Sequence, residues 1–430
     1  MYYIIIFIIL ILVAWILRRY IIAAFCKRGG FTGGAVGAVG AVGTVGAVGT
    51  DIIEYLKTAS IDDIYKNLLA KLSKSDICET IIGEGAMGVV RTPKVGAERA
   101  ITVGKKNIIL PVVIKSSKTD PDSIFRQHHD KRLYIYSYRD ITAEAIMLLA
   151  VRKLWEEKRS PHLPLILDYG TCNSETVNEI VIERQGLSTP FTYEINWIDE
   201  LPFWRPVSTL RTSITNSMAT LGELLQYIAM GSKQCKLPNG VTCDVTTLLD
   251  YITISYLHTH DLLFSNGIML QDMHPDNLFI HWLGESSHMG DRGIGGVEKI
   301  YYRVGKEYLG IETYGLLLKI GDIGASIYKP RKDIFVFGQC GNIEIASSIV
   351  DKIFFAQHTC AKFLKMLTDV VPFDFRKDMV SWNILTHYPY STYDWTLPAG
   401  IKLLTPSELL SKYTKYFVPR PNENDKIIII

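Results

Sequence analysis

The chain has 430 residues, of which 48% are hydrophobic and 21% are charged, and its formal net charge is +2 at pH 7. This balance, with no long basic run beyond residue 28, does not imply a nucleic-acid partner. The seven cysteines are odd in number and form no C-x-x-C pair, which argues for reduced thiols and against a zinc site or a disulfide framework. About 380 residues follow the N-terminal low-complexity region, enough for a two-lobed domain with insertions.

The first residues predict a membrane anchor. Residues 2–17 are apolar or aromatic without a charge, and Arg18 and Arg19 follow. At 1.5 Å per residue this run falls slightly short of a ~30 Å hydrocarbon core, but snorkelling arginines extend its reach. We expect a retained transmembrane helix with its basic flank at 1–28, rather than a cleaved signal peptide, which would need a basic segment before the apolar run. Because the positive charge follows the helix, we expect a single-pass membrane protein whose main domain is cytosolic.

A repeat of Gly, Ala or Thr, and Val occupies the next segment, 29–50. Glycine at every third position is typical of collagen, but the repeat has no proline, which argues against a triple helix. We interpret it as a disordered tether, with self-association as the alternative. Residues 51–72 then show helical periodicity, and the segment 51–80 is expected to be a helical element that packs on the domain that follows.

The segment GEGAMGVV places Gly83, Gly85 and Gly88 in the pattern G-x-G-x-x-G. Without Cβ atoms, these residues let a tight strand–turn–strand bring backbone N–H groups against phosphate oxygens. Val90 continues the second strand and would lie over the adenine of a nucleotide. Alone the pattern is weak, because it arises in many glycine-rich turns.

The next strand, PVVIK, is apolar and ends in one cation, Lys115, which is placed to reach the α- and β-phosphates. A surface lysine is the alternative interpretation. Residues 121–139 form an extra segment of unassigned use, and long helices are predicted at 140–157 and 245–265.

Two loops with acidic residues follow. QDMHPDN places Asp272 five residues before Asn277 and ahead of a short apolar strand. This spacing lets the carboxylate of Asp272 face an acceptor hydroxyl while the amide oxygen of Asn277 binds a metal. In GDIGA, Asp322 follows an apolar strand and precedes Gly324, so its carboxylate can turn toward Mg²⁺ that bridges the phosphates.

In this order the motifs resemble those of the protein kinase superfamily over residues 81–338. The Gly-rich loop fits the family pattern G-x-G-x-x-G-x-V, and VVIK matches the family's V-A-I-K, which ends in the lysine position held here by Lys115. QDMHPDN is similar to the end of the family's H-R-D-L-K-P-x-N. GDIG stands where the family has D-F-G. The resemblance implies an α+β, two-lobed fold behind the anchor, with a small β-rich lobe at 81–220 and a larger helical lobe at 221–430. It also implies ATP and Mg²⁺ as cofactors.

The same resemblance assigns two further residues. Glu144, on the predicted 140–157 helix, best fits the ion-pair partner of Lys115. The strand that leads into the hinge is either 179–186 or 212–220. We prefer the second, which makes Met218 the residue behind the adenine pocket and 178–211 an insertion.

Three departures from the family concern the catalytic loop. Leu270 and Gln271 replace the usual His and Arg, so an activation-loop phosphate has no obvious receiver. His274 replaces a Lys and can neutralise transferred phosphate only when protonated. The sequence D-x-H-P-x-N is also similar to that of atypical kinases of the UbiB/ADCK type, which lack this Gly-rich loop.

The peptide-binding segment departs further. Only ten residues separate Asp322 from Asp333, and no A-P-E follows. Residues 333–338, DIFVFG, look like the D-x-W-S-x-G start of the family's central helix. We expect an exposed insertion at 284–315 to build a substitute platform.

The sequence therefore predicts a membrane-anchored, ATP- and Mg²⁺-dependent phosphotransferase, a divergent serine/threonine protein kinase. A small-molecule or lipid acceptor is a variant of this prediction. The alternative is a pseudokinase that binds nucleotide as a scaffold. Because Lys115, Asp272, Asn277 and Asp322 are all present, we favour the active enzyme.

Overall fold

The computed structural model describes residues 50–72, 75–76, 81–84, 89–93, 98–103, 106–116, 124–129, 131–137, 141–157, 159–172, 177–183, 192–194, 205–208, 220–229, 233–237, 240–271, 273–282, 299–339, 360, 363–369, 376–387, 404–421 and 427–429. The chain divides into two compact units, 1–40 and 41–430, and every described residue lies in the second. The anchor expected at 1–28 lies outside the described residues. Among those residues, no helix has both the length and the apolar character that a membrane crossing needs.

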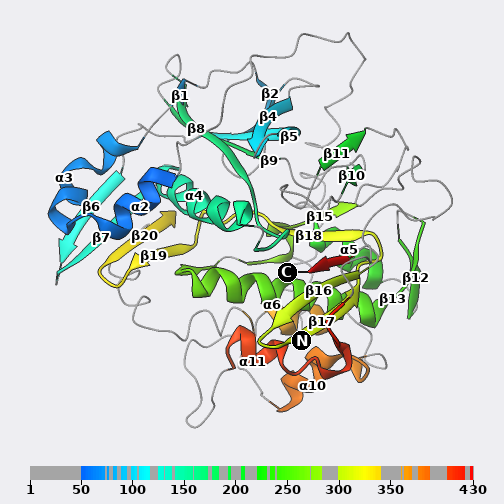
Figure 1. Ribbon diagram of the computed structural model, residues 1–430. Helices are drawn as coiled ribbons and strands as arrows, with labels where there is room; N and C mark the ends of the chain where they lie inside the picture. The colour runs from blue at the N-terminus through cyan, green and yellow to red at the C-terminus, as the bar shows by residue number, and fades with distance from the viewer. Residues whose placement is uncertain are drawn as a thin grey trace, which may run out of the picture. The chain divides into compact units, whose positions relative to one another are not determined.

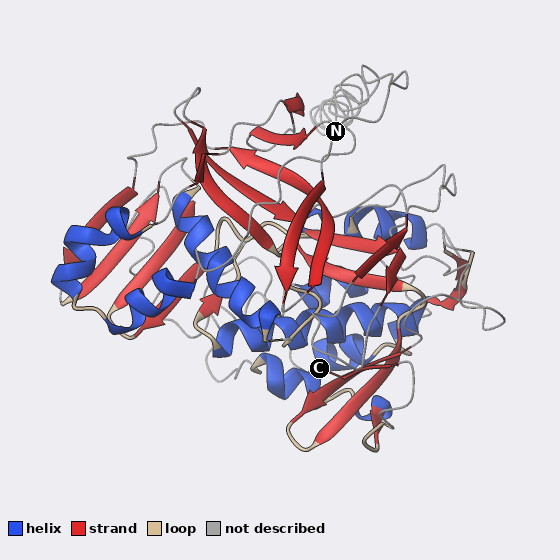
Figure 2. Cartoon of the chain, turned by 45° about the horizontal axis from the view of Figure 1, so that its top comes forward, coloured by secondary structure: helices blue, strands red, loops and turns tan. Residues whose placement is uncertain are grey.

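The second unit is a mixed α+β structure whose strands form several separate sheets (Figures 1 and 2). The largest sheet contains β1 (Ser75–Asp76), β2 (Ile81–Glu84), β3 (Val89–Pro93), β4 (Glu98–Val103), β5 (Lys106–Ser116), β8 (Ile166–Cys172) and β9 (Val177–Glu183). Its order is β1-β8-β9-β5-β3-β2, with β4 paired to β5. Strand β5 pairs with β4 up to Pro111 and with β9 from Val112 onward. Proline has no N–H to donate, which suits it to the point where the strand changes partner.

A second sheet joins two regions that are far apart in the sequence. Its strands are β6 (Ile124–His129), β7 (Arg132–Ser137), β14 (Ile268–Met269), β19 (Ile327–Arg331) and β20 (Ile334–Gln339), in the order β14-β19-β20-β7-β6. Helix α4 (Thr142–Glu156) follows β7 and packs against β20 and β8 (Figure 1). The extra segment at 121–139 therefore supplies strands that hold the chain following Asp322.

The prediction that residues 333–338 begin a helix is wrong, because Ile334–Gln339 is strand β20. This strand pairs in parallel with β7, and Phe335 and Phe337 stack on Tyr134 with ring centroids 5.6 and 6.2 Å apart. Aromatic and β-branched residues favour a strand when a neighbouring strand offers similar side chains.

Two short helices precede the large sheet. The helical periodicity at 51–72 is confirmed as α2 (Thr50–Thr58) and α3 (Ile61–Lys71), separated at Ser60. Ser60 caps α3 by accepting a hydrogen bond from the N–H of Asp63 at 3.1 Å. Helix α2 packs on α4 and β19, and Arg331 donates to the carbonyl of Ala59.

The longest described helix is α6 (Val245–Ser265), whose side chains are buried on nearly every side and against which α10 and α11 pack. The remaining described helices are α5 (Leu221–Ala229), α10 (Val380–His387), α11 (Pro406–Leu410) and the 3₁₀ helices η1 (Pro275–Asn277) and η2 (Thr414–Tyr416). Among the described residues, three two-stranded antiparallel sheets accompany them: β10 (Thr192–Glu194) with β11 (Arg205–Ser208), β12 (Gln234–Lys236) with β13 (Thr242–Asp244), and β15 (Leu278–Trp282) with β18 (Leu316–Ile320).

The structure describes residues 299–315 of the insertion that was expected to be exposed at 284–315, and this part is exposed on one face and buried on the other. Strands β16 (Lys299–Val304) and β17 (Glu307–Glu312) form a sheet with β21 (Phe417–Val418) and β22 (Ile427–Ile429), in the order β21-β17-β16-β22. Alternate side chains of β16 and β17, including Tyr302 and Leu309, are fully buried. The hairpin is therefore part of the hydrophobic core.

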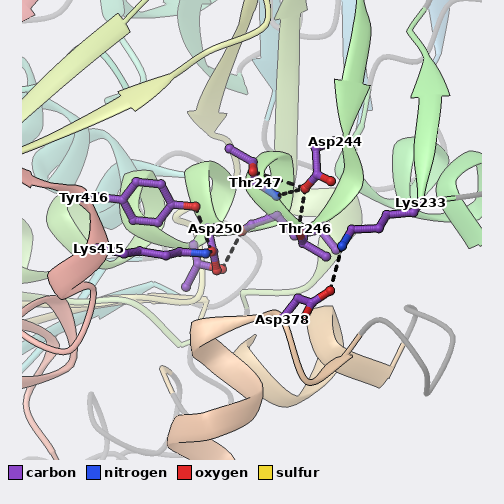
Figure 3. Close-up of polar contacts among 10 residues, drawn as sticks. Lys233, Asp244, Thr246, Thr247, Asp250, Asp378, Lys415 and Tyr416 are labelled. Atoms are coloured by element: carbon purple, nitrogen blue, oxygen red, sulfur yellow. Dashed lines mark hydrogen bonds and ion pairs between the residues drawn. The ribbon is translucent and has the colours of Figure 1, made fainter.

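Polar contacts tie α6 to the C-terminal region (Figure 3). The buried carboxylate of Asp250 accepts from Lys415 at 2.7 Å and from the hydroxyl of Tyr416 at 2.9 Å. Burial raises the pKa of Asp250, and Lys415 opposes this effect. Nearby, Lys233 pairs with Asp378 at 2.7 Å. These contacts fix η2 and α10 against α6.

Candidate functional site

Lys115, at the end of β5, brings together two carboxylates from distant parts of the chain. Its Nζ lies 2.9 Å from Oε1 and 2.8 Å from Oε2 of Glu144 on α4. The same atom lies 3.2 Å from Oδ1 of Asp322, in the loop after β18. The ion pair that the resemblance implies between Lys115 and Glu144 is therefore present, and Asp322 joins it.

The three side chains differ in exposure. Lys115 and Glu144 are 9% and 4% exposed, whereas Asp322 is 41% exposed. Burial alone would lower the pKa of Lys115, but the two carboxylates outweigh it and raise the pKa to about 12. Burial raises the pKa of Glu144, and Lys115 opposes this effect. When both carboxylates are ionised, one ammonium faces two of them and the cluster carries excess negative charge. The excess lies on its exposed side, at Asp322.

The loop at Asp322 depends on glycine at one position. Oδ1 of Asp322 also accepts the N–H of Gly324 at 2.8 Å. A Cβ at Gly324 would lie 2.8 Å from that oxygen and 3.0 Å from Oε2 of Glu144. A Cβ at Gly338 of β20 would collide with the carbonyl of Gly324. Strand β20 therefore packs directly against the loop and holds it beside α4.

Asn277 lies next to this loop. Strands β15 and β18 pair with Leu278 opposite Ile320, and the N–H of Gly321 donates to the carbonyl of Asn277 at 2.8 Å. The pairing of β15 with β18 brings the backbone of Asn277 beside the segment that carries Asp322. An amide oxygen and a carboxylate are oxygen donors of the kind that Mg²⁺ prefers.

Two further residues of the catalytic loop were predicted, and the structure describes one of them. Asp272 lies outside the described residues. Nδ1 of His274 is 3.8 Å from Oδ2 of Asp276, and its side chain is 38% exposed. A Cβ at Gly222, on α5, would collide with Asp276, so α5 and η1 are in close contact.

The Gly-rich loop is described in part. Gly83 lies in β2 and Val90 in β3, where Val90 is the register partner of Lys115. Gly85 and Gly88 lie outside the part of the chain that the structure describes. The paired strands thus bring the flank of the loop to the strand that ends at Lys115.

The preferred interpretation of 178–211 as an insertion is wrong at its beginning. Strand β9 (Val177–Glu183) lies between β5 and β8, with Ile180 opposite Lys115. The short connection from β8 and the β-branched residues of VNEIVIE are the sequence signals for this hairpin. Met218 lies beyond the described residues.

Sequence reasoning missed His162, which supports the strand that leads to Asp322. Its Nδ1 lies 2.6 Å from the carbonyl of Leu318, and its Nε2 lies 2.9 Å from the hydroxyl of Tyr302. Its own carbonyl accepts the N–H of Ile320 at 2.8 Å. Burial lowers the pKa of His162 to about 3, so the ring is neutral. A histidine within the apolar run PHLPLIL is the only signal that the sequence offers.

No protein-family model matches the chain, and a search of curated proteins returned no match. The interpretation of the site rests on its geometry.

Proposed function

We propose that the chain is an ATP- and Mg²⁺-dependent phosphotransferase with a protein-kinase-like fold, acting on a hydroxyl acceptor. The observation that supports this most directly is the contact of Lys115 with both Glu144 and Asp322. In protein kinases a strand lysine pairs with a helix glutamate, and a nearby aspartate in D-F-G holds Mg²⁺. Here the same residue types meet from three separate elements.

Each residue has a role in this proposal. Lys115 binds the α- and β-phosphates, and Glu144 positions its ammonium. Asp322 and Asn277 hold Mg²⁺, which neutralises charge on the phosphates. The excess negative charge of the cluster and the exposure of Asp322 both fit a cation at this point.

Asp272 is proposed as the base of the reaction. Its carboxylate accepts the proton of the acceptor hydroxyl as that oxygen bonds to the γ-phosphorus and the bond to the β-phosphate oxygen breaks. His274 is proposed to contact the transferred phosphate when protonated.

For the acceptor we propose serine or threonine of a protein, with a small molecule or lipid as the second candidate. One observation favours the second candidate. The chain after Asp322 forms β19 and β20 within a sheet, where the family has an open segment that binds peptide. One face of the β16–β17 hairpin is buried in the core, so only its other face is available as a substitute platform.

The N-terminal residues 1–28 are proposed as a membrane anchor that leaves this domain cytosolic. Protease treatment of sealed membranes should cleave after residue 29 only from the cytosolic side. An N-terminus of the mature chain near residues 24–28 would show a cleaved signal peptide instead.

The test of the function is phosphoryl transfer by the full chain from γ-labelled ATP, with Mg²⁺, to a basic protein and to lipid vesicles. Lys115→Met should abolish labelling, and Lys365→Met, which alters an exposed lysine paired with Asp369, should not. Nucleotide binding without transfer to any acceptor would support the pseudokinase. Absence of nucleotide binding would refute the proposal.

A further inference from the structure

The hairpin β12–β13 places two cysteines directly opposite each other. Cys235 and Cys243 are register partners on antiparallel strands, and their sulfurs lie 3.1 Å apart. Opposite residues of such strands have Cα atoms about 4.5 or 5.5 Å apart. Both values lie within the range of roughly 4.4–6.8 Å that a disulfide spans.

Little movement separates the two thiols from a bond. The S–S bond is about 2.05 Å long, so the sulfurs need to approach by about 1 Å. Both residues are free thiols and both are buried, at 8% exposure for Cys235 and 1% for Cys243. Rotation of the two side chains can bring the sulfurs together without a change in strand register.

The hairpin lies at a junction of the fold. It connects α5 to α6, and Asp244, directly after Cys243, caps α6 by accepting from the N–H of Thr247 at 2.9 Å (Figure 3). On the other strand, the carbonyl of Lys236 accepts from the hydroxyl of Tyr227 on α5 at 2.6 Å. A disulfide between the strands would therefore link the strand that contacts α5 to the strand that ends at the cap of α6.

We propose that Cys235 and Cys243 form a redox-active pair, oxidised to a reversible disulfide by hydrogen peroxide. This inference does not depend on the proposed phosphotransferase activity.

The oxidation proceeds in two steps. The Cys235 thiolate attacks one peroxide oxygen and the O–O bond breaks, giving a sulfenic acid at Cys235 and, after protonation of the leaving hydroxide, water. The sulfur of Cys243 then attacks the sulfur of Cys235, the S–O bond breaks, and the thiol proton leaves with the hydroxyl as a second water. Two electrons pass from the thiols to the peroxide.

The two thiols are not equivalent. Their mutual hydrogen bond lowers the pKa of Cys235 and raises the pKa of Cys243. Cys235 is also the more exposed of the two. Both properties make Cys235 the residue that peroxide attacks and Cys243 the one that resolves the sulfenic acid.

Trypsin separates the two cysteines, which makes the product easy to identify. Cleavage after Lys233, Lys236 and Arg292 yields peptides 234–236 and 237–292, each with one cysteine. The reduced full chain is treated with hydrogen peroxide, alkylated under denaturing conditions and digested. We expect a mass equal to the two peptides less two hydrogens, lost again on treatment with dithiothreitol. Recovery of both peptides in alkylated form would overturn the proposal.

Variants assign the order of attack. In Cys243→Ser, Cys235 should accumulate as a sulfenic acid that dimedone traps. Cys360→Ser is the matched control, because Cys360 is fully buried and its sulfur contacts His260 rather than another sulfur. In this variant Cys235 should not accumulate as a sulfenic acid. In the wild-type chain, in which Cys360 is present, we expect Cys235 to be oxidised about tenfold faster than Cys360, or more. Equal rates, or conversion of Cys235 to sulfinic acid without a linked peptide in the wild-type chain, would contradict the paired chemistry.

Discussion

Glu144 and Asp250 are both buried carboxylates held by a lysine, but the two clusters expose opposite charges. At Asp250 the lysine, Lys415, is the exposed partner, and one carboxylate meets one ammonium and one phenol hydroxyl (Figure 3). At Glu144 the lysine is enclosed, and a second carboxylate, Asp322, faces solvent.

This difference separates a structural contact from a candidate site. In the Asp250 cluster one carboxylate is balanced by one ammonium. In the Lys115 cluster a second carboxylate lies at an accessible position, where a bound cation can balance its charge. The predictions below test whether the second cluster binds and acts while the first only stabilises.

The largest expected effect concerns the residue proposed as the base of the reaction. Asp272→Asn should lower kcat by a factor on the order of 10²–10⁴ while ATP binding stays nearly intact, because the amide cannot accept the hydroxyl proton. Single-turnover kinetics with labelled ATP would measure this. An unchanged rate would remove Asp272 from the role of base.

A smaller effect is expected from crowding the open cluster. Gly324→Ala places a methyl group against the carboxylates of Asp322 and Glu144, and overpacking of this kind costs about 1–3 kcal/mol. Binding of Mg²⁺–ATP should weaken by roughly 5- to 150-fold if this cost falls on the bound state. The control is Gly305→Ala, in the β16–β17 turn, where nothing lies near the added methyl group; its φ of +65° strains any side chain, but that cost falls on the turn and not on the Lys115 cluster. The account fails here if the two variants bind nucleotide equally well.

The smallest effect concerns the support behind Asp322. The pKa of His162 is lowered from 6.5 to about 3. At pH values between about 3 and 6.5 the side chain therefore binds a proton in the unfolded chain but not in the folded chain. The stabilisation is present above pH 6.5 and is lost as the pH falls toward 3. Between pH 5 and 6, His162→Gln should reduce the pH dependence of the free energy of unfolding by about 1 kcal/mol per pH unit. Urea titrations would measure both slopes, and equal slopes would show that His162 is not excluded from protonation.

The sequence predicted those features that depend on residue type and short spacing. Lys115 at the end of an apolar strand, Glu144 in the first turn of a long helix, and Asp322 beside Gly324 could each be identified, and the ion pair between the first two is present. The contact between Lys115 and Glu144 could be predicted without knowing the structure of the chain between them.

Features that depend on distant partners were predicted less well. Residues 333–338 read as the start of a helix because the strand they pair with, β7, belongs to a segment without an assigned use. The buried face of the β16–β17 hairpin was not predicted, because the glycine-rich segment before it drew attention away from the alternation of Ile300 and Tyr302. In each case the neighbouring strand, rather than local propensity, decides the structure.

The most direct test of the account compares Asp322→Asn with Asp250→Asn by calorimetric titration of ATP into the full chain, with and without Mg²⁺. Asp322→Asn should weaken Mg²⁺-dependent binding by roughly tenfold or more, since a lost metal ligand costs at least as much as a lost supporting contact. Its metal-free binding should change little. Asp250→Asn should lower thermal stability and leave both affinities unchanged. Equal losses with and without Mg²⁺ in Asp322→Asn, or the same behaviour in the two variants, would contradict the assignment of the Lys115 cluster as a nucleotide site.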